Sequence, residues 1–155
     1  MKSKKLIVLV MALIFVLWTV STVSAKSERI EFTFTEECDW GTFDPGREIF
    51  TGNNYFSRDM RITCLETATI PEYTGTAQPV MNLNYIGSQD RGFWVSQPEG
   101  SFVTDEGGIW NLNCRFDGVV AQCVGHGEGL YAGMQVFVDF TPGVGGTGYI
   151  VDHNN

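Results

Sequence analysis

Apolar residues alternate with polar residues along most of this chain, and this period of two constrains the fold more than any other feature. Ile30, Phe32 and Phe34 are separated by polar residues, and the same spacing recurs over 110–116 and 134–140. Successive side chains of a β-strand point to opposite faces, so the spacing predicts strands with one buried face. No stretch of ten or more residues shows the 3.6-residue period of an amphipathic helix. The chain is therefore predicted to be all-β.

Gly and Pro residues divide the chain into about eight predicted strands. These strands are 29–37, 58–69, 74–86, 91–97, 101–104, 108–116, 119–126 and 131–141, with a short closing strand at 147–151. Residues 39–57 are predicted to form a long irregular connection. Strands with one apolar face bury it in a closed barrel or between two packed sheets. We expect a single small antiparallel β-barrel, with an immunoglobulin-like β-sandwich as the alternative.

Residues 1–25 have the pattern of an export signal. Three lysines within the first five residues precede an apolar run, and small residues suited to cleavage follow at 23–25. We expect cleavage after Ala25, which leaves residues 26–155 as one secreted domain. The alternative is an uncleaved anchor, because the 20 residues of 6–25 are long enough to cross a bilayer as a helix.

Removal of the signal makes the chain strongly acidic. Seven basic residues then stand against eighteen acidic residues, which gives a net charge of −11. Such a surface repels both nucleic acid and anionic lipid. We therefore expect no nucleic-acid partner and no stable membrane insertion after cleavage. The sequence gives no prediction of the oligomeric state.

An even number of cysteines in an exported chain favours disulfides over metal ligands. A two-residue turn at Gly118-Val119 places Cys114 directly opposite Cys123, whereas a turn at Asp117-Gly118 leaves the two cysteines diagonal. The first register predicts a Cys114–Cys123 disulfide. A Cys38–Cys64 disulfide then follows by elimination, because these are the two remaining cysteines.

A glycine-rich segment, Gly125-His126-Gly127-Glu128-Gly129-Leu130-Tyr131-Ala132-Gly133, leads into the last long predicted strand. It resembles the Gly-x-Gly-x-(aromatic)-x-Gly connection of allene oxide cyclase-like and dirigent-like β-barrels. Cys38, Thr74-Gly75-Thr76 and Gly108-Ile109-Trp110 precede it, in an order similar to that of a group of exported bacterial proteins. The resemblance implies a barrel whose apolar interior can enclose a small hydrophobic molecule. It implies no catalytic residue, because no polar residue of the cyclases or dirigent proteins can be matched here.

The polar residues of the sequence do not identify a catalytic group. Glu36-Glu37 and Asp105-Glu106 are adjacent acidic pairs, but neighbours on a strand point to opposite faces, so neither pair alone supplies two facing carboxyl groups. His126 and Glu128 would share one face of an extended segment, but a metal site needs a third ligand. We therefore predict no catalytic residue, no metal site and no cofactor.

Aromatic residues are the best candidates for lining a ligand site in the mouth of a barrel. These candidates are Tyr85, Trp94, Trp110 and Tyr131, although Trp110 falls on the apolar face of its strand and suits core packing. The first hypothesis is a non-catalytic exported barrel that binds a small apolar molecule. One alternative is a cyclase or isomerase that acts on a hydrophobic substrate inside the same barrel. Another is an envelope-associated interaction protein that uses its acidic outer face or residues 39–57.

Overall fold

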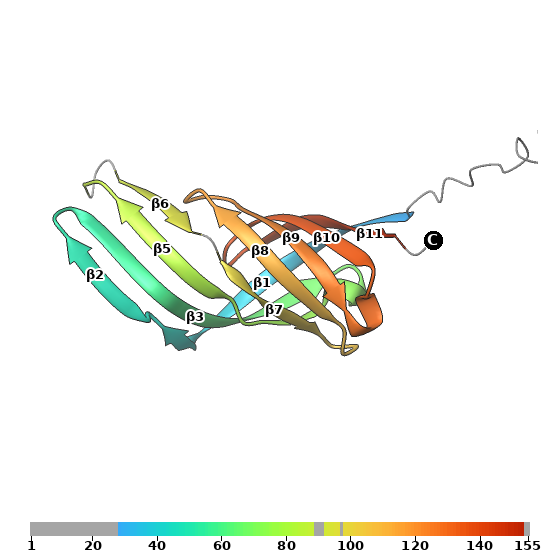
Figure 1. The fold of residues 1–155 in the computed structure, drawn as a ribbon. Helices are drawn as coiled ribbons and strands as arrows, with labels where there is room; N and C mark the ends of the chain where they lie inside the picture. The colour runs from blue at the N-terminus through green and yellow to red at the C-terminus, as the bar shows by residue number, and fades with distance from the viewer. Residues whose placement is uncertain (1–27, 89–91, 97, 154–155) are drawn as a thin grey trace, which may run out of the picture.

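The computed structural model describes residues 28–88, 92–96 and 98–153. These residues form β-strands joined by turns, with two short 3-10 helices (Figure 1). The elements are β1 (Glu28–Asp44), β2 (Arg47–Thr51), β3 (Asn54–Ala68), η1 (Pro71–Tyr73), β4 (Gly75–Ala77), β5 (Val80–Ile86), β6 (Phe93–Ser96), β7 (Glu99–Thr104), β8 (Ile109–Phe116), β9 (Ala121–Glu128), η2 (Gly129–Tyr131), β10 (Met134–Thr141) and β11 (Gly145–Asp152). The predicted all-β class is confirmed.

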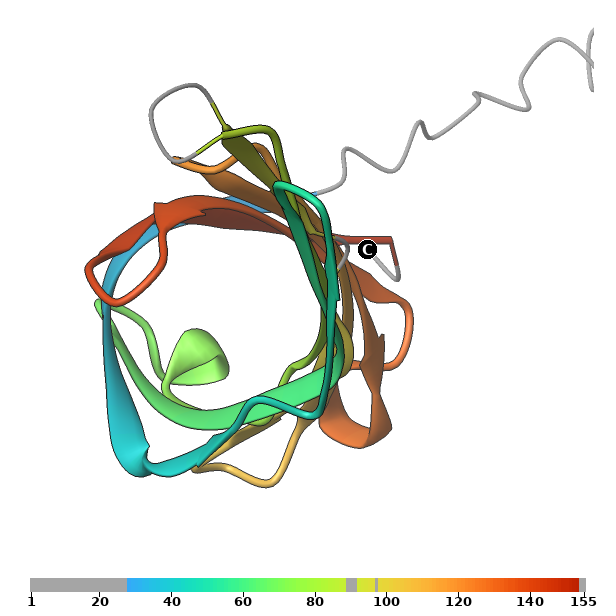
Figure 2. The same ribbon diagram turned by 90° about the vertical axis from the view of Figure 1, so that its left-hand side faces the viewer.

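The strands close into an antiparallel barrel (Figure 2). The ring runs β1-β11-β10-β9-β8-β7-β4-β3, and it closes because β3 also pairs with β1. Strands β4 and β5 both pair with β3, one after the other along its length, so β4 and β5 together occupy one position in the ring. Strands β2 and β6 lie outside it. The predicted barrel of about eight strands is therefore confirmed, and the β-sandwich alternative is wrong.

The buried core lies inside the ring, where the predicted alternation directs the apolar side chains. Phe32, Phe34, Val136, Val138 and Ile150 are all buried there. Figure 2 looks along the barrel and shows η1 inside the ring. Tyr73 of η1 packs against Phe32, Phe34 and Phe102, with ring centroids 4.7–5.1 Å apart. The helix η1 thus fills one part of the interior.

The predicted irregular connection over 39–57 is wrong. Strand β1 continues to Asp44, and β2 forms a hairpin with the start of β3 around Gly52, whose φ is +59°. Every residue of β2 is exposed, so no buried face imposes alternation on its sequence. The pairing of β1 with β3 also shifts register between Asp39 and Asp44, which interrupts the period of two.

The single strand predicted over 74–86 is divided into β4 and β5. The division falls at Gln78 and Pro79, where β4 ends and β5 has not yet begun. Proline has no N–H to donate to a neighbouring strand, so it interrupts the ladder at this point. Both halves still pair with β3.

Both predicted disulfides, Cys38–Cys64 and Cys114–Cys123, are present. Cys114 lies directly opposite Cys123, and the N–H of Asp117 donates to the carbonyl of Val120 at 3.2 Å, as the two-residue turn requires. Gly118 has a φ of +99°, a conformation that favours glycine. The predicted register is therefore confirmed.

The disulfides also bear on where the protein works. Two disulfides without a free cysteine among the described residues indicate an oxidising, extracytoplasmic compartment. No helix in the described ranges is both long and apolar enough to cross a bilayer. The predicted signal segment, residues 1–25, lies outside the described residues.

The Gly-x-Gly segment makes room for a buried aromatic pair. Tyr131 stacks on Trp110 with ring centroids 4.8 Å apart, and both side chains are buried. A Cβ atom at Gly108 would collide with the ring of Tyr131, and one at Gly127 would collide with its backbone. These two glycines are therefore needed for the Tyr131–Trp110 contact.

We expect Gly127→Ala to destabilise the fold by about 1–3 kcal/mol, because the new methyl group overpacks against the backbone of Tyr131. The free energy of unfolding in urea measures the effect. Gly41→Ala is the control, since a Cβ atom there meets only the side chain of Asp39. Equal stability of the two variants would contradict this explanation of the motif.

Candidate functional site

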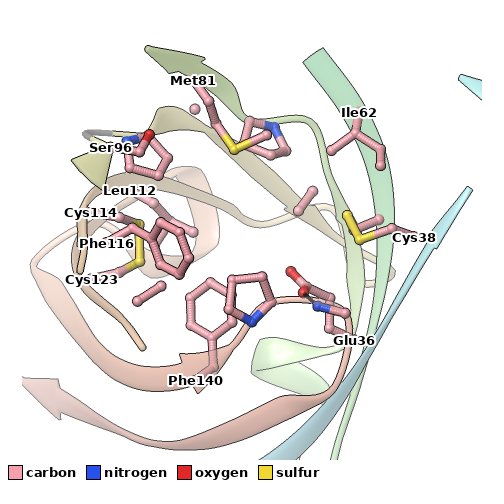
Figure 3. Close-up of a pocket in the computed structure, with 18 of the residues that line it drawn as sticks. Glu36, Cys38, Ile62, Met81, Ser96, Leu112, Cys114, Phe116, Cys123 and Phe140 are labelled. Atoms are coloured by element: carbon pink, nitrogen blue, oxygen red, sulfur yellow. Dashed lines mark hydrogen bonds between the residues drawn. A yellow bond between two sulfur atoms is a disulfide. The ribbon is translucent and has the colours of Figure 1, made fainter. Parts of the chain in front are cut away.

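A cavity of about 280 Å³ lies in the barrel interior (Figure 3). Its walls are mainly apolar and include both disulfides, two methionines, and two phenylalanines in addition to Phe43 near its mouth. The residues that carry these groups are Cys38, Cys64, Cys114, Cys123, Phe116, Phe140, Met60 and Met81. Its volume lies near the lower end of the range for small-molecule sites.

The cavity exists because the ring is unevenly filled. Trp110, Tyr131 and Tyr73 occupy one part of the interior. The cavity wall contains smaller residues, including Ala77 and Ala121. An eight-stranded barrel is just wide enough to be filled by side chains or to hold one small ligand. Small residues in this part of the wall therefore leave space for a ligand.

Two aromatic residues near the end of β1 mark the mouth of the cavity. Trp40 and Phe43 line it, and their ring centroids are 5.8 Å apart. Trp40 is also 72% exposed and Phe43 is 40% exposed. Side chains that contact both the cavity and the solvent lie at its opening, so the cavity is accessible at this end of β1.

A pair of glutamates forms the main polar feature of the cavity wall. Glu36 of β1 lies directly opposite Glu66 of β3, and both line the cavity. The two carboxyl groups hydrogen-bond to each other. The N–H of Gly143 donates to Oε2 of Glu36. Glu66 is only 4% exposed, so its carboxyl group is almost fully removed from water.

Burial and mutual repulsion keep a proton on this pair. Burial raises the pKa of Glu66 to about 9, and the charge of Glu36 and the hydrogen bond to it act in the same direction. Burial also raises the pKa of Glu36, while the hydrogen bonds from Gly143 and Glu66 oppose the rise. Tyr73 also lines the cavity, and its pKa is raised by burial and then by the two carboxylates. Two carboxyl groups this close titrate as a unit and share a proton.

Ser96 supplies a second polar group, on another wall. Its side chain is 1% exposed, lines the cavity, and its Oγ has no hydrogen-bond partner. Figure 3 shows Ser96 across the cavity from Glu36. Oε2 of Glu66 is also buried, and it has no hydrogen-bond partner other than the carboxyl group of Glu36. Buried polar atoms are nearly always hydrogen-bonded, so these two atoms are available to a bound molecule.

Three of the four aromatic residues predicted for the ligand site lie outside the cavity wall. Trp110 and Tyr131 pack in the core, where Nε1 of Trp110 donates to the carbonyl of Glu72 and the hydroxyl of Tyr131 lies 3.1 Å from Oγ1 of Thr104. The hydroxyl of Tyr85 donates to the carbonyl of Ser88, and Tyr85 is outside the cavity wall. Trp94 lies in β6, but its side chain is outside the described part of the chain.

Glu36, Glu66 and Ser96 are the polar residues that sequence reasoning missed. In the sequence Glu36 stands beside Glu37, but Glu37 is exposed on the outer face, so the two side chains do not face each other. The predicted Cys38–Cys64 disulfide does indicate that Glu36 faces Glu66, because it fixes the register of the two strands. Because β1 and β3 are antiparallel, the residue two positions before Cys38 lies opposite the residue two positions after Cys64. These residues are Glu36 and Glu66.

The possible metal ligands do not form a complete site in this state. Among the described residues, the one group of three potential ligands is Glu36, Cys38 and Cys64, and the disulfide occupies both sulfurs. His126 and Glu128 lie exposed on the outside of the barrel. Nδ1 of His126 lies 3.3 Å from the amide of Gln135, and Glu128 accepts a hydrogen bond from Asn111.

Comparison with known proteins finds no protein-family model, no curated protein and no solved structure that matches this chain. The geometry and chemistry of the cavity therefore carry the functional argument.

The stability of this protein is expected to fall as the pH rises from about 5 toward 9. The folded state keeps a proton on Glu66 that the unfolded chain releases near its ordinary pKa of 4.5, so the stabilisation is complete below that pH and is lost as the pH approaches about 9. Since each unit of pKa shift corresponds to about 1.4 kcal/mol, the fall should exceed that amount. Denaturant unfolding at several pH values measures it.

Glu66→Gln should flatten this pH dependence, because the amide does not titrate. Glu37→Gln is the matched control, since Glu37 lies on the same strand as Glu36 but is exposed on the outer face. Parallel pH profiles for Glu66→Gln and Glu37→Gln would show that Glu66 is not the buried titrating group.

Proposed function

We propose that this protein is an exported binding protein that holds a small, largely apolar molecule inside its barrel. The cavity of about 280 Å³ is the observation that supports this function most directly. Its apolar walls favour binding by about 25 cal/mol for each Å² of apolar surface removed from water. A few polar groups, among them Glu66 and Ser96, can orient the molecule.

We also propose that residues 1–25 direct export and are removed after Ala25. The two disulfides support an oxidising destination, where such cross-links persist. The resemblance to allene oxide cyclase-like and dirigent-like barrels remains a prediction, and it agrees with an enclosed apolar ligand.

The intact mass of protein secreted by its own host should correspond to a chain that begins at Lys26 and contains two disulfides. Mass spectrometry before and after reduction measures both features, because each disulfide adds two hydrogens on reduction. A secreted or envelope-bound chain that retains residues 1–25 would instead support an uncleaved anchor.

A cyclase or isomerase is the second candidate function, and the Glu36–Glu66 pair is the observation that favours it. A neutral carboxyl group beside an ionised one offers both a proton donor and a proton acceptor. A binding protein releases its ligand unchanged, whereas an enzyme of this kind releases a rearranged product. Analysis by NMR of a ligand recovered after incubation with the protein distinguishes the two.

Filling the cavity should abolish binding. We expect Met81→Trp to weaken the binding of the neutral probe 2-phenylethanol by at least about tenfold, because the indole ring takes up space inside the barrel. Isothermal titration calorimetry measures the affinity. Leu65→Trp is the matched control, since Leu65 is exposed and adjacent to Glu66 on β3, and it should bind like the original protein. Unchanged binding by Met81→Trp would place the ligand outside the cavity.

A further inference from the structure

We propose that the ligand is a small organic amine whose ammonium group lies at the Glu36–Glu66 pair and whose apolar body fills the rest of the cavity. This inference rests on the proposed binding function and specifies the chemical class of its ligand. It follows from the charge of the cavity wall, from the kind of atoms that surround the pair and from a second polar group across the cavity.

The carboxyl pair introduces negative charge into an apolar space without a cation to balance it. No Lys, Arg or His occurs among the described residues that line the cavity. Glu99 also borders the cavity, but its side chain is exposed on the outer face of β7. The single ion pair among the described residues, Arg29–Glu31, does not involve the cavity. Because a buried charge is costly unless it is paired, a cationic ligand is the complement of this wall.

The remaining walls suit an organic cation better than a metal ion. Metal ions require several oxygen, nitrogen or thiolate ligands, but the sulfurs next to Glu36 are joined in the Cys38–Cys64 disulfide. An ammonium group requires only hydrogen-bond acceptors, which the carboxyl pair provides. The rings of Tyr73 and Phe140 line the same cavity, and aromatic faces attract cations. An amine with an apolar body can therefore use both kinds of surface.

Ser96 is an observation independent of the acidic pair. It comes from β6, its Oγ is buried without a partner, and it faces the cavity across from Glu36 (Figure 3). A hydroxyl group can donate and accept a hydrogen bond. The ligand is therefore expected to carry a second polar group, such as a hydroxyl, at the end opposite its ammonium group.

Two probes with the same skeleton test the ammonium group. We expect 2-phenylethylamine to bind at least about tenfold more tightly than 2-phenylethanol in isothermal titration calorimetry at pH 7. The double variant Glu36→Gln/Glu66→Gln should lose this preference and retain its affinity for the alcohol. Glu37→Gln, the exposed control, should keep the preference for the amine. Glu36→Gln alone tests the same point if the double variant does not fold, because Glu36 is only partly buried.

A third probe tests Ser96. Tyramine carries a hydroxyl group on the ring end of 2-phenylethylamine and should bind more tightly than that amine. Ser96→Ala should remove the advantage and leave the affinity for 2-phenylethylamine unchanged. An advantage that persists in Ser96→Ala would overturn the role of this hydroxyl.

The pH dependence provides a further test, because three titratable side chains, those of Glu36, Glu66 and Tyr73, line the cavity, whereas that of Glu99 is exposed. Amine affinity should rise from pH 5 to pH 8, because the Glu36–Glu66 pair loses the first of its two protons while the ligand keeps its charge. An affinity that falls over this range would contradict an ammonium site and would favour a ligand that accepts the shared proton.

The outcomes separate this inference from the proposed function. Equal binding of the amine and the alcohol, unaffected by the Gln substitutions, would overturn the amine inference and leave a small-molecule binding protein. Failure of all three probes to bind would count against both. Binding of Ca²⁺ or Zn²⁺ that is lost in the double variant, without a preference for the amine, would replace the organic cation with a metal ion.

Discussion

The antiparallel pairing of β1 with β3 is the interaction on which the rest of the structure depends. This pairing joins the first strand of the described chain to the third and closes the ring, so no edge strand remains in the ring itself. The same register places Cys38 opposite Cys64 and Glu36 opposite Glu66. A shift of β1 by one residue would turn Glu36 and Cys38 to the outer face and separate them from their partners on β3. Closure of the barrel, one disulfide and the carboxyl pair therefore share one structural cause.

The carboxyl pair departs from the pattern of apolar residues on the inner face of the barrel. Alternation directs apolar side chains inward along β1 and β3, but Glu36 and Glu66 occupy inward positions. Burying carboxyl groups without a cation costs stability, and the raised pKa of Glu66 expresses that cost. Because perturbed titratable groups in a cavity concentrate at functional sites, this departure supports a role for the pair in binding.

The sequence was informative wherever one face of a strand is buried and one turn sets a register. Alternation predicts most strands of the ring, and Gly118-Val119 predicts the Cys114–Cys123 pairing. It was uninformative for β2, which is exposed throughout. The predicted site placed aromatic residues at the ligand, but Gly108 and Gly127 give Tyr131 space in the core. The position of a cavity depends on the volumes of side chains from many strands together, which no single segment contains.

The disulfides explain how the barrel can remain partly hollow. A cavity of about 280 Å³ leaves the side chains around it without the packing contacts of a filled interior. Cross-links that close loops of 26 and 9 residues contribute on the order of 3 kcal/mol each, mainly by restricting the unfolded chain. Both disulfides lie in the cavity wall. Covalent cross-links thus offset the missing core and leave the space free for a ligand.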